Sequence, residues 1–412
     1  MSHAEPVVSV DPDVLAASSV NESRLQRAAG LVSDWVATGV LPGASLLVAR
    51  GGNVVVEGYW GLADARTRRA AGRDTLWSVA SITKPVTTAA VMACVDRGLL
   101  SLDRPIAESL PEFSLPGDLR PWRHDITLRH LLTHTSGLAG FSRDNLPLRH
   151  RHAPIEDFIT SFLDEEVHFP PGQWHLYSSV GIGLAAEAMG RALIAAAPHQ
   201  NRTRSLQASE SFTLQLFKAL GAEDGAFRPD DAEQARSAWV ESTGQEGVDW
   251  EIGNSRYYRS LGMPWGGLFT RACDILAFVQ AFLPGRRDIS SRFISRAALD
   301  EMVRQQVAPP EAPVSVAPSQ RDITWDPTSE PRANVSWGLG WEVKGSSPSD
   351  YFGDDAHATA FGHIGASGTI VWADPEEDLA VAFLTNRAWV SRWPVKERRA
   401  ERLANAIMAA LD

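Results

Sequence analysis

The segment Gly43–Gly61, GASLLVARGGNVVVEGYWG, decides the fold. Two runs rich in β-branched and aromatic side chains flank Gly51-Gly52, a pair that accepts the positive φ of a tight hairpin turn. The segment Gly368–Asn386, GTIVWADPEEDLAVAFLTN, repeats this pattern around a polar turn near the other end of the chain. We therefore expect one antiparallel sheet that is built from both ends of the chain.

Helical patterns flank these strands. Asn21 can cap a helix whose apolar residues recur at spacings of three and four, and Gly39 ends it. Its apolar residues are Leu25, Ala28, Val32 and Trp35. The end of the chain, VKERRAERLANAIMAALD, is an amphipathic pattern with Leu403, Ile407 and Leu411 on one face. We predict that a helix from each end of the chain flanks the sheet.

The middle of the chain has a different pattern. Apolar helical runs such as IEDFITSFLDEE and GIGLAAEAMGRALIAA fill most of it. We predict an α+β fold with a flexible N-terminal arm at 1–20, an α/β sheet domain formed by 21–100 plus 335–412, and a mostly helical inserted domain at 101–334. The proline-rich loop 308–332 is long enough to be either functional or disordered, and a lid or a subunit contact are its candidate roles.

Charge and composition exclude several classes of function. The chain of 412 residues has a formal net charge of −11, which argues against nucleic acid because phosphate neutralisation needs a basic patch. No apolar run is long enough for a membrane span, and we expect no signal peptide at the N-terminus. Cys94 and Cys273 lie in apolar helical patterns and read as free thiols. We predict a cytoplasmic protein with no nucleic-acid or membrane partner; the sequence leaves its oligomeric state undefined.

The sequence SITK at Ser81–Lys84 is the main candidate for catalysis. The chain has 39 lysines and arginines, of which only four are lysines, and one lysine follows a serine by three positions. Pro85 is tolerated only in a first helical turn, so Ser81 lies at a helix N-terminus with Lys84 on the same face. A lysine, unlike an arginine, can lose its proton when it is desolvated, and it can then activate the hydroxyl. The structural alternative is a serine cap beside a solvated lysine.

Two further elements could complete such a site. Tyr177 stands between a Pro-Pro-Gly turn and a helix, where its phenol could exchange protons with a serine or could be a plain core residue. His363-Ile364-Gly365 leads into a strand, and the missing side chain of Gly365 would let a ligand approach the backbone. The amide of Ala366 could then point at a substrate carbonyl beside Ser81. The alternative is a β-bulge with an exposed histidine.

His130 and His134 have the spacing of four that metal ligands show on a helix. No glutamate follows His130 to make a metalloprotease motif, and no third ligand is evident. We expect both histidines to form local hydrogen bonds in a short helix that begins at Thr127 and ends at Gly137. We therefore predict no metal and no cofactor.

The motifs Ser81-Ile-Thr-Lys84, Tyr177-Ser-Ser179 and His363-Ile-Gly365, in this order and rough spacing, resemble those of the serine β-lactamase-like hydrolases. This family includes class C β-lactamases, DD-peptidases, D-aminopeptidases and family VIII carboxylesterases. Three other segments are similar to it as well: Ile126–Leu138, Trp265–Leu283 and Ala380–Arg387. The resemblance covers about residues 24 to 410. It implies a β-lactamase/transpeptidase-like fold, with the site where the sheet meets a helical domain.

The resemblance also implies a role for each residue of these motifs. Ser81 would be the acylated nucleophile, Lys84 its neighbouring amine, and Tyr177 the general base and then the acid to the leaving group. The amides of Ser81 and Ala366 would form the oxyanion hole. Substrate would lie along Ser179, His363 and Gly365.

Two departures from the class C pattern bear on the substrate. Ser179 replaces the asparagine of Tyr-x-Asn, and His363 replaces the lysine of Lys-Thr-Gly, which weakens the attraction for a substrate carboxylate. We predict a carboxylesterase that takes short acyl or aryl esters as its small-molecule substrates. The alternatives are a D-aminopeptidase, a D-amino-acid amidase or a DD-peptidase-like amide hydrolase, a weaker β-lactamase, an acyltransferase, and an inactive scaffold of the same fold.

Overall fold

The computed structural model describes residues 7–9, 18–115, 120–197, 204–286, 293–307, 335–346 and 349–411. The predicted proline-rich loop 308–332 lies outside the described residues.

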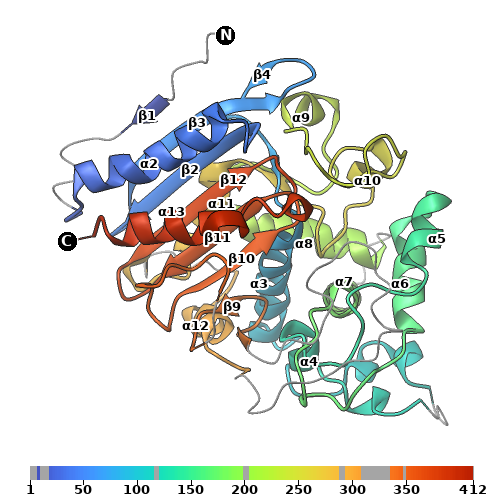
Figure 1. Ribbon diagram of the computed structural model, residues 1–412. Helices are drawn as coiled ribbons and strands as arrows, with labels where there is room; N and C mark the ends of the chain where they lie inside the picture. Colours follow the sequence, from blue (N-terminus) through green and yellow to red (C-terminus); the bar gives the residue numbers. More distant parts are fainter. Residues whose placement is uncertain are drawn as a thin grey trace.

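Strands from both ends of the chain form one antiparallel sheet, as predicted (Figure 1). Its order is β1-β3-β2-β12-β11-β10-β9-β8, and β4 pairs with β3 off this path. The two hairpins meet where β2 pairs with β12, from Leu379↔Arg50 to Thr385↔Ala44. The strands are β1 Val7–Ser9, β2 Gly43–Arg50, β3 Asn53–Asp64, β4 Arg69–Ala70, β8 Ser336–Trp337, β9 Glu342–Val343, β10 Phe361–Gly365, β11 Thr369–Asp374 and β12 Leu379–Thr385.

The two faces of the sheet belong to two different hydrophobic cores. Residues along β12 alternate between the two cores: Val381 and Phe383 belong to one, and Ala382 and Leu384 belong to the other. Successive side chains of a strand point to opposite faces, so this alternation follows directly from the apolar run AVAFLT. The sheet is therefore buried on both sides and needs helices on both.

Figure 1 shows how the helices cover these faces. Helices α2 and α13 pack on each other over one face, which confirms the prediction of flanking terminal helices. Asn21 caps α2, as predicted, by accepting from the amide of Arg24 at 3.1 Å. The helices are α2 Glu22–Ala37, α3 Thr83–Asp96, α4 Leu128–Leu132, α5 Asn145–His150, α6 Ile155–Leu163, α7 Ser179–Ala196, α8 Ser205–Ala219, α9 Asp231–Arg236, α10 Arg256–Ser260, α11 Ala272–Gln280, α12 Arg296–Val303 and α13 Arg399–Met408.

The structure adds strands where the sequence indicated none. In the segment predicted as a flexible arm, β1 pairs with β3. Within the predicted helical segment, β6 (Gly225–Ala226) and β7 (Phe269–Thr270) form a second small sheet with β5 (Trp77–Ser78). Helix α11 also comes from that segment, yet it packs on β2 and β12. Because α11 contacts strands of the sheet domain, the boundaries of the helical domain at 101 and 334 remain a proposal.

Helix α7 forms the centre of the helical part. Among the described residues it alone is long and apolar enough to cross a membrane, but 67% of that window is buried inside the structure. It packs against α3, α4, α6 and α8. Here α7 therefore serves as a core helix, and its N-terminus is the point at which Tyr177 enters the site.

Candidate active site

Ser81 lies in a tight turn that leads directly into α3. A 3₁₀ turn over Ala80–Ile82 precedes α3, and Ala80 has a φ of +45°, in the left-handed region that side chains disfavour. The hydroxyl of Thr83 donates to the carbonyl of Ala80 at 2.6 Å and helps to hold this turn. Strained backbone of this kind is found at functional sites. It leaves Ser81 partly exposed while its neighbours are buried.

Lys84 points back at Ser81 from the first turn of α3. Its Nζ donates to Ser81 Oγ at 2.9 Å and to the carbonyl of Trp265 at 3.0 Å. The side chain is only 1% exposed, so the structural alternative of a solvated lysine is wrong. A buried amine in contact with a partly exposed hydroxyl is the arrangement of an activated nucleophile.

The carbonyl that receives Lys84 belongs to a fixed loop. The hydroxyl of Thr87 donates to the carbonyl of Pro264 at 2.7 Å, and that of Tyr258 donates to the carbonyl of Gly266 at 3.0 Å. Trp265 lies between these two anchored residues. Sequence patterns could not predict a backbone carbonyl here, because the contact joins residues 181 positions apart.

Tyr177 lies beside Lys84 and His363. The Nζ of Lys84 is 4.6 Å from the centroid of the Tyr177 ring. The phenol oxygen is 3.3 Å from Nε2 of His363. The structure thus brings together Tyr177 and the pair Ser81 and Lys84, which are predicted from two separate motifs.

The hydrogen bonds of His363 define its tautomer. Nδ1 lies 2.7 Å from the carbonyl oxygen of Ile364, which can only accept, so Nδ1 carries the hydrogen. Nε2 must then accept, and the hydroxyl of Tyr177 donates to it. Burial, together with the nearby Lys84, lowers the pKa of His363 to about 3, so the ring is neutral at physiological pH. At 2% exposure it is no exposed histidine, which excludes that alternative.

Gly365 is required by the protein itself. A Cβ at this position would overlap the hydroxyl of Thr369 and the carbonyl oxygen of Val79. Close packing of β10 on the turn that precedes Ser81 is thus a further reason for a glycine here, and the predicted space for a ligand beside the backbone stays a prediction. The hydroxyls of Ser367 and Thr369 also donate to the carbonyls of Ser78 and Val79.

These contacts define the surroundings of Ala366. Its two neighbours, Gly365 and Ser367, both contact the segment two to three residues before Ser81. Ala366 is half-buried, and its carbonyl accepts from the amide of Trp389 at 2.8 Å. The turn after β10 and the turn before α3 are therefore neighbours, as an oxyanion hole with one amide from each would need.

Ser179 begins α7 but does not cap it. The cap is Ser178, whose hydroxyl accepts from the amide of Gly181 at 3.0 Å and donates to the carbonyl of Ala139 at 2.7 Å. Ser179 is 1% exposed, and its amide donates to the carbonyl of Gly140 at 2.8 Å. It lies two residues beyond Tyr177, on the helix that the cap starts.

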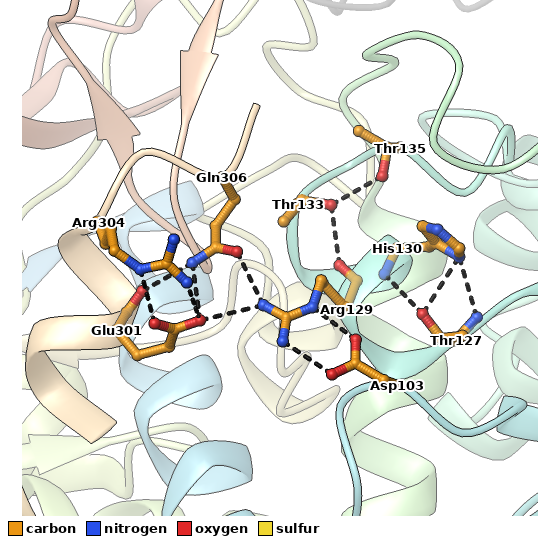
Figure 2. Close-up of polar contacts among 9 residues, drawn as sticks. All are labelled: Asp103, Thr127, Arg129, His130, Thr133, Thr135, Glu301, Arg304 and Gln306. Carbon is orange, nitrogen blue, oxygen red and sulfur yellow. Dashed lines mark hydrogen bonds and ion pairs between the residues drawn. The ribbon is translucent and has the colours of Figure 1, made fainter. Parts of the chain in front are cut away.

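The two histidines with metal-like spacing serve different purposes. Figure 2 shows His130 in a reciprocal cap with Thr127, whose amide donates to Nδ1 at 3.2 Å. His134 accepts instead from the amide of Ser178 at 3.1 Å. His130 therefore forms the predicted local hydrogen bonds, whereas the prediction is wrong for His134, whose side chain bonds a residue 44 positions away. The helix also ends at Leu132, earlier than Gly137. The described residues contain no group of three or more potential metal ligands.

Trp337 also lies against the site, and no sequence signal points to it. Its ring centroid is 5.8 Å from those of both Tyr177 and His363, and 5.1 Å from that of His134. It sits on the short strand β8, which has no motif of its own. Trp337 therefore adds an aromatic contact to the ring of Tyr177.

Comparison with known proteins agrees with this geometry. The Beta-lactamase family model matches residues 28–405. Esterase EstB of Burkholderia gladioli is 36% identical over 166 residues, which are 36% of this chain and 40% of that protein. Protein flp of Staphylococcus aureus strain N315 is 26% identical over 146 residues, 35% of this chain and 29% of that protein. The chain thus spans less than half the length of these relatives.

Solved structures share the architecture over almost the whole chain. A penicillin-binding protein homolog from Caulobacter crescentus has a TM-score of 0.72 at 23% identity, and covers 99% of this chain and 100% of its own. A family VIII carboxylesterase has a TM-score of 0.69 at 20% identity, over 95% of this chain and 99% of its own. These likenesses confirm the predicted fold.

Proposed function

The chain belongs to the Beta-lactamase family, and on that premise we propose that it is a serine hydrolase that forms an acyl-enzyme on Ser81. The observation that carries the proposal is the 2.9 Å hydrogen bond between Lys84 Nζ and Ser81 Oγ, made by a lysine that is 1% exposed. Burial disfavours the ammonium form, so the amine is suited to take up the serine proton.

Acylation begins with attack of Ser81 Oγ on the ester carbonyl. The serine proton passes to Lys84 Nζ, its immediate hydrogen-bond partner. When the tetrahedral intermediate collapses, the leaving alkoxide needs a proton. Tyr177 holds one, because its hydroxyl donates to the neutral His363 in the resting site. The ammonium of Lys84, beside the ring of Tyr177, then returns a proton to the phenolate.

Deacylation uses the same groups in the reverse order. Water takes the place of the departed alcohol. As it attacks the acyl carbonyl, Tyr177 accepts the proton of the water and passes its own phenolic proton to Lys84. Ser81 then leaves with a proton from Lys84. We propose that the amides of Ser81 and Ala366 stabilise the oxyanion in both steps, which is supported by the packing of their two turns.

We further propose that the substrates are uncharged esters with short acyl or aryl groups. The neutral ring of His363 stands where class C enzymes carry a lysine, so a substrate carboxylate gains little attraction there. Ser179 offers fewer donors than the asparagine it replaces. The match to a protein named as an esterase supports the same choice.

The test is a matched substrate panel. Wild type and Ser81→Ala are assayed on p-nitrophenyl esters of increasing acyl length, on D-amino-acid amides and on a β-lactam. The proposal predicts turnover of short esters that is lost in Ser81→Ala. Turnover of the amides alone would make the protein an amide hydrolase, and ester turnover that survives in Ser81→Ala would refute the nucleophile. A chain that turns over none of them would be a scaffold.

We propose a cytoplasmic location because both cysteines are free thiols. Both cysteines are free, Cys94 buried in α3 and Cys273 half-buried in α11. Burial raises the pKa of the Cys94 thiol to about 12, which makes it unreactive. A reducing compartment suits such a chain.

A further inference from the structure

One residue, His134, holds the backbone on both sides of Tyr177. Its carbonyl accepts from the amide of Leu176 at 2.8 Å, and its Nδ1 accepts from the amide of Ser178 at 3.1 Å. Its ring centroid lies 4.6 Å from that of Tyr177. The residue before Tyr177, the residue after it and its ring are therefore all in contact with the same histidine.

His134 has an unusual backbone conformation, and its side chain bonds the amide of Ser178 from that conformation. Its φ is +59°, in the left-handed region, although the residue is 0% exposed and not a glycine. Such a conformation is unfavourable for a residue with a side chain and persists only when the surroundings impose it. A right-handed His134 would carry its side chain in another direction, away from the amide of Ser178.

The neighbours of His134 impose the conformation. Figure 2 shows the hydroxyls of Thr133 and Thr135, on either side of it, joined at 2.8 Å. The hydroxyl of Thr133 also bonds the carbonyl of Arg129 at 2.8 Å. Arg129 in turn forms ion pairs with Asp103 at 2.6 Å and with Glu301 of α12 at 3.1 Å. The network in Figure 2 thus anchors the loop that presents His134.

The protonation state of His134 suits this role. Nδ1 can accept from Ser178 only if it carries no hydrogen. Burial, with the added repulsion of the nearby His175 and Lys84, keeps the pKa of His134 well below its usual value. The ring is neutral at physiological pH, and the hydrogen bond to Ser178 is retained.

We propose that His134 is a positioning residue that sets the orientation of Tyr177 through the amide of Ser178. This inference rests on the proposed function, in which Tyr177 exchanges protons with Lys84 and the leaving group. The contact fixes where the phenol oxygen meets His363 and where the ring meets Lys84. A displacement of about 1 Å in such a group can cost on the order of 100-fold in rate.

The test compares two amide side chains at this position. In His134→Asn the amide oxygen is three bonds from Cα, as Nδ1 is, and asparagine tolerates a positive φ. In His134→Gln the oxygen is four bonds away, at the position of Nε2, where it misses the amide of Ser178. His152→Gln is the control, since His152 also has a positive φ of 51° and stacks at 4.5 Å on a tyrosine, Tyr257, outside the site.

Two measurements are made on each variant. The first is kcat and KM on a short p-nitrophenyl ester, with thermal unfolding to verify folding. The second is the NMR spectrum of protein labelled at tyrosine Cζ, in which the five tyrosines give five signals and Tyr177→Phe identifies one. We expect His134→Gln to lower kcat by about 10- to 100-fold at nearly constant KM, and to shift the Tyr177 signal. In His134→Asn and His152→Gln, kcat and the Tyr177 signal should both stay near their wild-type values.

Two outcomes would overturn the inference. The first is that His134→Gln keeps the wild-type kcat and the wild-type Tyr177 signal. The second is that His134→Asn loses as much kcat as His134→Gln, because the imidazole ring itself, and not its hydrogen bond to Ser178, would then be what matters. If His134→Gln does not fold, His134→Asn tests the inference alone: a kcat and a Tyr177 signal near wild type support it, and a loss of kcat overturns it. If ester turnover survives in Ser81→Ala, the proposed function fails by itself, and the Tyr177 signal still reports whether His134 positions that residue.

Discussion

Replacement of Lys84 by arginine tests the proton transfer directly. Lys84→Arg keeps hydrogen-bond donors near Ser81 Oγ and the Trp265 carbonyl, the two groups that Nζ contacts at 2.9 and 3.0 Å. It removes one property, because a guanidinium does not lose its proton in proteins. If Lys84 only donates hydrogen bonds, arginine can replace it; if Lys84 accepts the serine proton, arginine cannot.

The expected loss follows from the size of proton-transfer assistance. General-base help contributes about 10²- to 10⁴-fold, so we expect kcat/KM to fall by that factor, or about 3–5 kcal/mol in the activation barrier. Lys84 is 1% exposed, and fitting a larger head group there costs about 1–3 kcal/mol of stability. Typical domains have about 5–15 kcal/mol to lose. The variant should therefore stay folded, and the rate loss should exceed any effect of unfolding.

The assay is ester hydrolysis, with the folded fraction measured by urea unfolding in the same buffer. Lys344→Arg is the matched control, because Lys344 Nζ also donates to backbone carbonyls, those of Asp354 and Ala356. It should keep wild-type kcat/KM. A Lys84→Arg variant that is folded and as active as Lys344→Arg would refute the role of Lys84 as a proton acceptor.

Two further predictions concern stability. Gly365→Ala should lower the free energy of unfolding in urea by about 1–3 kcal/mol, since its Cβ overlaps Thr369 and the carbonyl of Val79. Gly72→Ala is the control and should leave this free energy unchanged, because nothing lies within 4 Å of its Cβ. Equal results for the two variants would refute the close packing at Gly365. At the far end of β11, a hydrogen bond to Asp374 raises the pKa of His357 above its usual 6.5. This contribution to stability is complete below pH 6.5 and is lost as pH rises through the raised pKa. The free energy of unfolding of wild type, relative to His357→Gln, should thus fall as the pH rises above 6.5; no change would contradict the pairing.

Local chemistry made much of the fold predictable. Gly51-Gly52 can hardly be anything but a hairpin turn between two β-branched runs, and the structure places it between β2 and β3. Asn21 caps α2 through its own side chain, three residues from the amide it receives. Ser81 and Lys84 are likewise three residues apart, so the sequence alone predicts their contact.

Contacts between distant segments were not predictable in this way. Gly365 was expected to make room for a ligand, and nothing in the sequence showed that it also makes room for Val79, 286 residues earlier in the chain. His134 read as a local helix residue, yet its φ of +59° and its bond to Ser178 come from tertiary packing. Strand β1 forms on the edge of the long strand β3, and β6 pairs with β7, which is as short as itself. Three residues or fewer carry no periodicity of their own, so neither strand could be predicted.

The central claim is that the hydroxyl of Ser81 is the reactive nucleophile of this protein. A fluorophosphonate reacts covalently with activated serines, and peptide mass mapping then identifies the residue that carries the adduct. The account predicts one adduct per chain, on the peptide that contains Ser81, and a much slower reaction in Lys84→Arg. An adduct on another residue, or labelling at equal rates in both proteins, would contradict it.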